Sequence, residues 1–162
     1  MRLRQEVQAL PRRAHERRVA AARLADILPR PKPILVVAAV LRDGEGRVLI
    51  AQRPAGRHLA GRWEFPGGKV GAGEGEHEAL ARELREELGI ELLGATPFMR
   101  TRHAYDDRSV ELSLWRVERF NGTPQPLDGQ QLKWVAPALL PDEDLLEADR
   151  PFVAALANPA LR

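Results

Sequence analysis

The chain has 162 residues, of which 44% are apolar and 30% charged, and its net charge is +2. These values are typical of one globular domain and exclude a fibrous or wholly disordered protein. The absence of cysteine excludes disulfides and thiolate zinc sites, and no apolar run approaches the roughly twenty residues of a membrane span. We therefore expect a cytoplasmic protein that does not contact the membrane.

The first 32 residues differ in charge from the rest of the chain. They carry nine basic and three acidic side chains, a net charge of +6, so the remainder is at −4. An acidic body argues against direct nucleic-acid binding, because phosphate backbones are bound by basic surfaces. Helical spacing of apolar residues between prolines predicts a basic N-terminal helical extension over 1–33, followed by one domain over 34–162. The extension is either a packing appendage or a contact surface for an anionic partner.

The domain alternates strand signals with two helix signals. Short apolar segments rich in β-branched and aromatic residues predict strands, and Asp43-Gly44 marks a hairpin turn after the first of them. A helix is expected from Glu76 to Leu88 because Gly89 is a natural terminator, and a last helix is opened by Asp149 and Pro151. The predicted strands cover residues 34–41, 47–53, 62–65 (ended by Pro66-Gly67-Gly68), 97–105, 109–120 and 132–136. The order indicates an α+β fold.

The helix at 76–88 belongs to a segment, residues 68–90, that holds six glutamates. Glu83, Glu86 and Glu87 stand at i, i+3 and i+4 and share one helix face, next to a stripe of leucines that would dock the helix on a sheet. Like charges at this spacing destabilise a helix unless solvent or a cation offsets them. Carboxylates without histidine or cysteine suit Mg²⁺, with Mn²⁺ as the alternative. The other interpretation is a solvated face with ion pairs to Arg82 at i, i+4.

The wider spacing resembles a known family. Gly68, Glu74 and the run Arg82-Glu83-Leu84-x-Glu86-Glu87-x-Gly89-Ile90 match the Nudix box, and the chain is identified by this resemblance as a Nudix hydrolase. The flanks "AQRPAGRHLAGRWEFPGGK", "HAYDDRSVELSLW", "DGQQLKWV" and "ADRPF" resemble the MutT-type branch, which cleaves nucleoside triphosphates to monophosphate and pyrophosphate. The resemblance covers about residues 34–158 and implies a mixed β-sheet sandwiched between helices (α/β/α).

The resemblance also implies roles for single residues. Glu83 and Glu86 would be catalytic, and Arg82 would orient the glutamates through charge-assisted hydrogen bonds. The metal would be held by Glu83, Glu86 and Glu87, with a backbone carbonyl of Gly67 or Gly68 and with Asp128, where relatives place a glutamate. Glu74 would support the loop. The expected substrate contacts are Arg53, His58, Glu64, Phe65, Lys69, Tyr105, Arg108 and Asp149.

Asp149 bears on the choice of base. It falls where 8-oxo-dGTP-cleaving members carry asparagine, and an ionised aspartate can only accept hydrogen bonds. It would take the N7 hydrogen of 8-oxoguanine while Arg108 supplies a donor, or it would accept from the cytosine N4 amine. A third reading is that Asp149 only caps the last helix.

The resemblance leaves three functions open. We expect Mg²⁺-dependent hydrolysis of 8-oxo-dGTP by a monomer or weak dimer, with a cytidine triphosphate or its modified forms as the alternative substrate. The second function is a catalytically idle nucleotide-binding module, against which the full carboxylate set argues. The third is cleavage of diadenosine polyphosphates or dinucleotide sugars, for which different flanks are expected.

Overall fold

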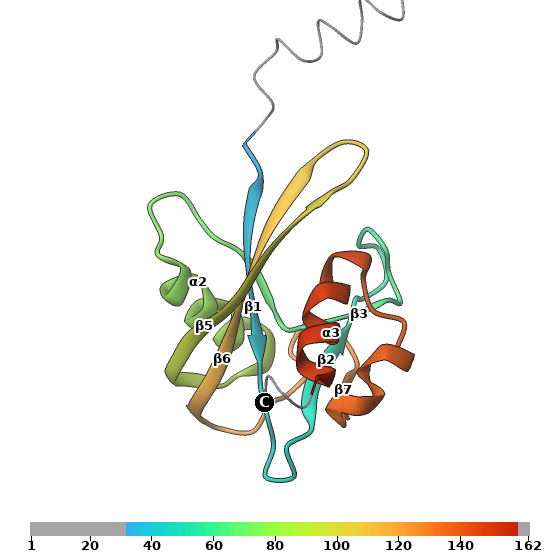
Figure 1. Cartoon of the computed structure of the whole chain (residues 1–162). Coiled ribbons are helices and arrows are strands. Elements are labelled where there is room, and N and C mark those ends of the chain that lie inside the picture. Colours follow the sequence, from blue (N-terminus) through green and yellow to red (C-terminus); the bar gives the residue numbers. More distant parts are fainter. Residues whose placement is uncertain (1–31, 159–162) are drawn as a thin grey trace, which may run out of the picture. The chain divides into compact units, whose positions relative to one another are not determined.

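The structure, a computed structural model, describes residues 32–158, and the predicted N-terminal helix lies outside them. The described chain forms two sheets and two α-helices, shown in Figure 1. In chain order the elements are β1 (Ile34–Val40), β2 (Val48–Gln52), β3 (Trp63–Glu64), β4 (Gly67–Lys69), α2 (Glu76–Leu88), β5 (Glu91–Ala104), β6 (Ser109–Asn121), β7 (Leu132–Val135), the 3₁₀ helices η1 (Pro137–Asp142) and η2 (Glu147–Asp149), and α3 (Arg150–Ala157). Among these described elements, none is a helix long and apolar enough to cross a bilayer.

The larger sheet is mixed and has the strand order β4-β1-β6-β5. β1 runs parallel to β6 and antiparallel to β4, while β5 and β6 form a long antiparallel hairpin. The smaller sheet, β3-β2-β7, is antiparallel. The mixed sheet between helices confirms the predicted α+β fold, and the helix over residues 76–88 and the one after Asp149 are both present.

β1 is buried on both faces, which explains its uninterrupted apolar sequence. Val37 and Ala39 pack with the leucine stripe of α2 in one core, whereas Ala38 and Val40 pack with Phe152 of α3 in the other. Figure 1 shows the two helices on opposite sides of β1. The alternation of side chains along one strand therefore produces the three-layer arrangement.

Two expectations from the sequence need correction. The glycine pair after Pro66 does more than end a strand, because Gly67–Lys69 is itself strand β4, paired with residues 36–38 of β1. β5 begins at Glu91 and not at residue 97, since residues 91–96 pair with β6 through register shifts. The turn predicted at Asp43-Gly44 is present, and the Asp43 side chain accepts hydrogen bonds from the backbone of Glu45 and Arg47.

Backbone hydrogen bonds also hold the segment before α3 against β3. The N–H of Trp63 donates to the carbonyl of Asp144 at 2.9 Å, and the N–H of Leu146 donates to the carbonyl of Trp63 at 3.0 Å. This pairing brings Asp149 next to Phe65, although they are far apart in the sequence. β4 meanwhile lies against α2, so the glycine pair, the glutamates and Asp149 come together at one end of the sheets.

Candidate active site

A cavity of about 450 Å³ opens where β1, β4, α2 and the segment before α3 meet. It is lined by most of the residues that the sequence nominates. These are Gly67, Gly68, Glu83 and Glu87 from the predicted metal set and Arg53, His58, Glu64, Phe65, Lys69, Tyr105, Arg108 and Asp149 from the predicted substrate set. Arg82, Glu86 and Asp128 do not line it.

Two carboxylates of α2 face this cavity. Glu83 and Glu87 stand one helical turn apart, and both side chains reach the glycine pair of β4. Burial, and next the nearby charges of Glu83, Glu64 and Asp128, together raise the pKa of Glu87 to about 8, against an opposing hydrogen bond from the N–H of Gly67. Several carboxylates close together and away from water favour the binding of either a proton or a cation.

The glycine pair is shaped by close contacts on both sides. A Cβ on Gly67 would lie 2.0 Å from the carbonyl oxygen of Val37, so the strand can approach β1 only without a side chain. A Cβ on Gly68 would lie 2.3 Å from the carboxyl carbon of Glu83. The missing side chain of Gly68 is therefore the space in which the Glu83 carboxylate sits.

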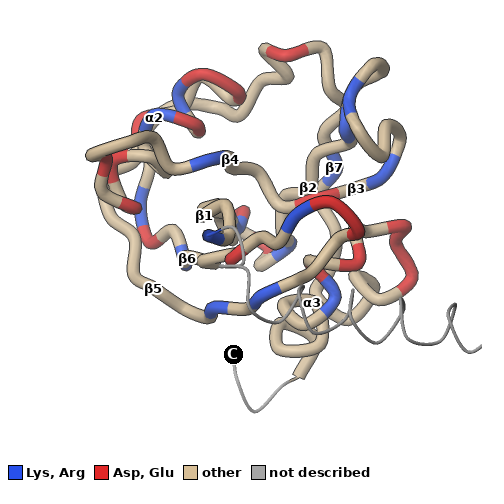
Figure 2. Tube along the Cα trace, turned by 90° about the horizontal axis from the view of Figure 1, so that it is seen from above, with Lys and Arg blue, Asp and Glu red and all other residues tan. Residues whose placement is uncertain are grey.

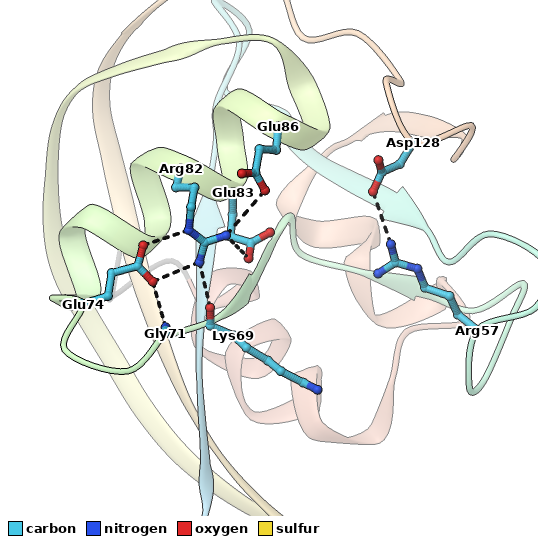
Figure 3. Close-up of polar contacts among 8 residues, drawn as sticks. All are labelled: Arg57, Lys69, Gly71, Glu74, Arg82, Glu83, Glu86 and Asp128. Atoms are coloured by element: carbon cyan, nitrogen blue, oxygen red, sulfur yellow. Dashed lines mark hydrogen bonds and ion pairs between the residues drawn. The ribbon is translucent and has the colours of Figure 1, made fainter.

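Arg82 does not line the cavity, but its contacts hold neighbouring parts of the site in place. Figure 3 shows these contacts. Its guanidinium makes two hydrogen bonds to Glu74, at 2.8 and 3.0 Å, one to Glu83 at 2.8 Å and one to the carbonyl of Lys69 at 3.0 Å. Glu74 also accepts a hydrogen bond from the N–H of Gly71, and these bonds with Arg82 lower the pKa of Glu74 to about 2. One arginine thus ties α2 to the loop before it and holds the Glu83 carboxylate.

Glu86 does not line the cavity that Glu83 and Glu87 face. Its side chain is 61% exposed and is 3.5 Å from the same Arg82 nitrogen that binds Glu83. Within residues 32–158, no three acidic, histidine or cysteine side chains are gathered closely enough to hold a metal ion as they stand. The expected convergence of three glutamates on the cavity is therefore not found. The i, i+4 pair of Arg82 with Glu78 is also not seen, since Glu78 accepts from the N–H of Gly75 instead.

The residues present nevertheless fit a hard cation. Glu83 and Glu87 offer oxygen ligands only, beside a backbone that a glycine leaves open, which is the donor chemistry of Mg²⁺ or Mn²⁺. The raised pKa of Glu87 indicates a local excess of negative charge that a cation would offset. Figure 2 shows acidic and basic segments side by side along α2.

The far end of the cavity is formed by a buried carboxyl group. Asp149 is 3% exposed, and the N–H of Phe65 donates a hydrogen bond to it. Burial, and next the charge of Glu64, raise the pKa of Asp149 to about 8. Its side chain makes no capping hydrogen bond to α3, so the interpretation of Asp149 as a helix cap alone is wrong.

Arginine and aromatic side chains complete the walls. Arg53 is ion-paired with Glu64 at 2.5 Å and also donates to the carbonyl of His58 at 2.8 Å. The Tyr105 ring meets the His58 ring edge to face, with centroids 6.1 Å apart. The wall is therefore aromatic and rimmed by cations, which suits a planar base with an anionic tail.

Arg57 lines the cavity although the sequence did not nominate it. It lies in the loop between β2 and β3, and its guanidinium is 3.3 Å from the carboxylate of Asp128. The sequence does contain one sign that Arg57 could belong to the site: it is a second basic residue, four positions after Arg53, in a glycine-containing loop. The partner of the Arg57 side chain, Asp128, is distant in the sequence, so the signal alone was too weak.

Comparison with known proteins gives consistent results from sequence and from structure. The NUDIX domain family matches residues 32–156. The CTP pyrophosphohydrolase of Escherichia coli (strain K12) is 42% identical over 124 residues, covering 76% of this chain and 91% of that protein. The 8-oxo-dGTP diphosphatase of the same strain is 34% identical over 125 residues, covering 77% and 97%. A solved MutT structure, from work on Aliivibrio salmonicida and Vibrio cholerae, is 35% identical with a TM-score of 0.67, covering 78% and 98%.

Proposed function

Because this chain belongs to the Nudix family and is a hydrolase of phosphoanhydride bonds, we propose that it cleaves 8-oxo-dGTP to the monophosphate and pyrophosphate. The observation that carries the proposal is that one cavity is lined both by the carboxylates of α2 and by Asp149. The first group suits a metal-bound triphosphate and the second suits the edge of a base. The substrate in this proposal is a free nucleotide of the cytoplasmic pool, not a nucleic acid.

We propose that Mg²⁺, or Mn²⁺ in its place, is held by Glu83 and Glu87 with a carbonyl of the glycine pair. When bound, the cation neutralises the phosphates and makes a water molecule more acidic. Glu86 would join after leaving Arg82, a contact that is long and exposed and therefore weak. Asp128 would join from the neighbouring loop.

The protein's own residues then have distinct tasks. Arg82 keeps the Glu83 carboxylate oriented through its 2.8 Å hydrogen bond, while Glu74 and the Lys69 carbonyl hold the guanidinium in place. Glu83 or Glu86 accepts the proton of the attacking water. Arg53 and Lys69 contact the phosphates as these enter the cavity, since arginine and lysine both bind phosphate oxygens.

Asp149 supports oxidised guanine as the base. With a pKa of about 8, it is mostly protonated at neutral pH, and a neutral carboxyl group has one donor and one acceptor. It can then donate to O6 and accept the N7 hydrogen that only the oxidised purine carries, as an asparagine amide does. Arg108 lines the same cavity and provides a second donor.

The second candidate substrate is a cytidine triphosphate or its modified forms. It is favoured by the 42% identity to a protein named CTP pyrophosphohydrolase. An ionised Asp149 would accept a hydrogen bond from the cytosine N4 amine, the usual partner of a carboxylate. The two candidates therefore differ in the protonation state that they require of one side chain.

The test is catalytic efficiency, kcat/KM, with Mg²⁺ for 8-oxo-dGTP, dGTP, CTP and dCTP. We expect 8-oxo-dGTP to be cleaved at least tenfold more efficiently than the others. A tenfold advantage for either cytosine nucleotide would overturn the choice, and Asp149→Asn should then shift the preference toward 8-oxo-dGTP. Cleavage of none of the four would point to an idle nucleotide-binding module.

A further inference from the structure

An ion pair joins two loops at the mouth of the cavity. Arg57 of the β2–β3 loop and Asp128 of the β6–β7 loop face each other in Figure 3, away from the cluster around Arg82. Their single contact is 3.3 Å long, and the two side chains are 57% and 39% exposed. Exposed pairs with one long contact contribute little to stability, so the pair is easily broken by a stronger partner.

Asp128 is the fixed member of this pair. Its N–H donates to the side-chain oxygen of Gln130 at 2.8 Å, and the side-chain nitrogen of Gln130 donates to the carbonyl of Glu87 at 2.9 Å. Gln130 is buried. The loop that carries Asp128 is thereby tied to the end of α2, next to the glutamates.

Arg57 is the movable member. It lies on an exposed turn, and its guanidinium contacts the Asp128 carboxylate from there. Arg53, which we also propose for phosphate binding, uses part of its guanidinium to bind Glu64 and the His58 carbonyl. The charge of Arg57 is also felt at Glu64, where it lowers the pKa against the effect of burial. A guanidinium that lines the cavity thus stands between its two ends.

We propose that Arg57 binds the outer phosphates of the triphosphate and that Asp128 holds it at the cavity mouth until the substrate replaces that carboxylate. This inference rests on the proposed function. Guanidinium groups pair with phosphate in a bidentate, charge-assisted way that one carboxylate oxygen at 3.3 Å does not match. The exchange needs rotation of one long, exposed side chain and no movement of α2.

The test is direct binding of non-hydrolysable α,β-methylene 8-oxo-dGTP and dCTP to the full chain with Mg²⁺, by calorimetry. Arg57→Ala should weaken the binding of both probes about tenfold and to the same extent, because phosphate contacts do not depend on the base. It should leave the affinity for dGMP, which lacks the outer phosphates, unchanged. Arg57→Lys should recover part of the loss, and the salt dependence of Arg57→Ala binding should be shallower.

Arg62→Ala is the matched control. Arg62 lies in the same loop and is paired with Asp144 at 3.5 Å, but it does not line the cavity. We expect it to change triphosphate binding less than twofold.

The outcomes separate the two proposals. If Arg57→Ala binds the triphosphates as tightly as Arg62→Ala does, the proposed role of Arg57 is wrong. The proposed function would still stand in that case. An equal loss for dGMP and the triphosphates would also overturn it, since the residue would then act on the site as a whole. Failure of the wild type to bind either triphosphate would overturn the proposed function and this inference together.

Discussion

The Asp149 carboxyl group is buried beside Glu64 and receives one backbone hydrogen bond, from Phe65. Water cannot stabilise its charge there, and Glu64 repels it, so the folded protein favours the protonated form. The same group in an unfolded chain ionises near pH 4. One residue therefore couples the choice of base to the stability of the fold.

The first prediction concerns this coupling. Between about pH 4 and pH 8 the folded protein keeps a proton on Asp149 that the unfolded chain has lost, so the free energy of unfolding falls as pH rises through this window. Asp149→Asn carries no such proton. Its stability relative to the wild type should therefore increase from pH 5 to pH 8, by roughly 1.4 kcal/mol per pH unit at most, and level off above.

Urea unfolding at pH 5, 7 and 8.5 with EDTA measures this difference. EDTA removes bound cations, so that the titration of Glu87 is common to both proteins and cancels. Asp142→Asn, an exposed change in η1, is the control and should run parallel to the wild type. Parallel curves for Asp149→Asn as well would show that Asp149 is ionised in the folded protein at pH 7.

At the same scale, the sequence predicts those site residues whose neighbours are local. Glu83, Glu87 and Arg82 lie on one helix, so their spacing alone indicates that they share a region of its surface. That Glu86 does not line the cavity was not predictable, because helix spacing fixes the shared face but not where each side chain ends. Arg57 was missed for a related reason, since its partner is 71 positions away in the chain.

At the scale of elements, β4 and α2 define the metal end of the site. A strand at the glycine pair was not predicted, because two glycines after a proline read locally as a break. Pairing with β1 decides otherwise, and that pairing is possible only because Gly67 has no side chain to meet the Val37 carbonyl. The helix was predicted correctly because its leucine stripe and the terminal Gly89 are local signals.

The second prediction follows from the approach of β4 to α2. A methyl group at Gly68 would lie 2.3 Å from the carboxyl carbon of Glu83 and would displace it, which is easy for the end of a flexible side chain. Gly68→Ala should therefore lower kcat at least a hundredfold while shifting the melting temperature by only a few degrees. Steady-state kinetics with Mg²⁺ and thermal unfolding test the two halves.

Gly44→Ala is the control, since an added methyl group there meets nothing within 4 Å and both measurements should match the wild type. Gly67→Ala should behave in the opposite way and unfold the protein, because its methyl group would meet the backbone of β1. Normal turnover in Gly68→Ala would mean that the Glu83 carboxylate is not needed at this position.

At the scale of the molecule, residues within 32–158 build two cores. One core contains Phe65, Leu114 and Phe152, and the other contains Leu41 and the leucines of α2. Among the described residues, those that line the cavity lie between Ile34 and Asp149. The basic charge before residue 33 is thus separate in sequence from all the groups to which chemistry has been assigned.

The third prediction is that a protein beginning at residue 32 keeps kcat/KM within about twofold of the full chain and unfolds at a similar temperature, because residues after 31 build two cores and line the cavity. The family match also begins at residue 32.

Kinetics at two salt concentrations provide the control. The removed residues and Lys32 together carry a net charge of +6, and long-range attraction of the triphosphate fades with salt. The truncated protein could lose activity at low salt, and the full chain could show the same loss at high salt. Together these results would mean that the extension attracts the substrate electrostatically. A folded but inactive truncated protein at either salt concentration would contradict the prediction and place the extension in the site or in an obligatory oligomer.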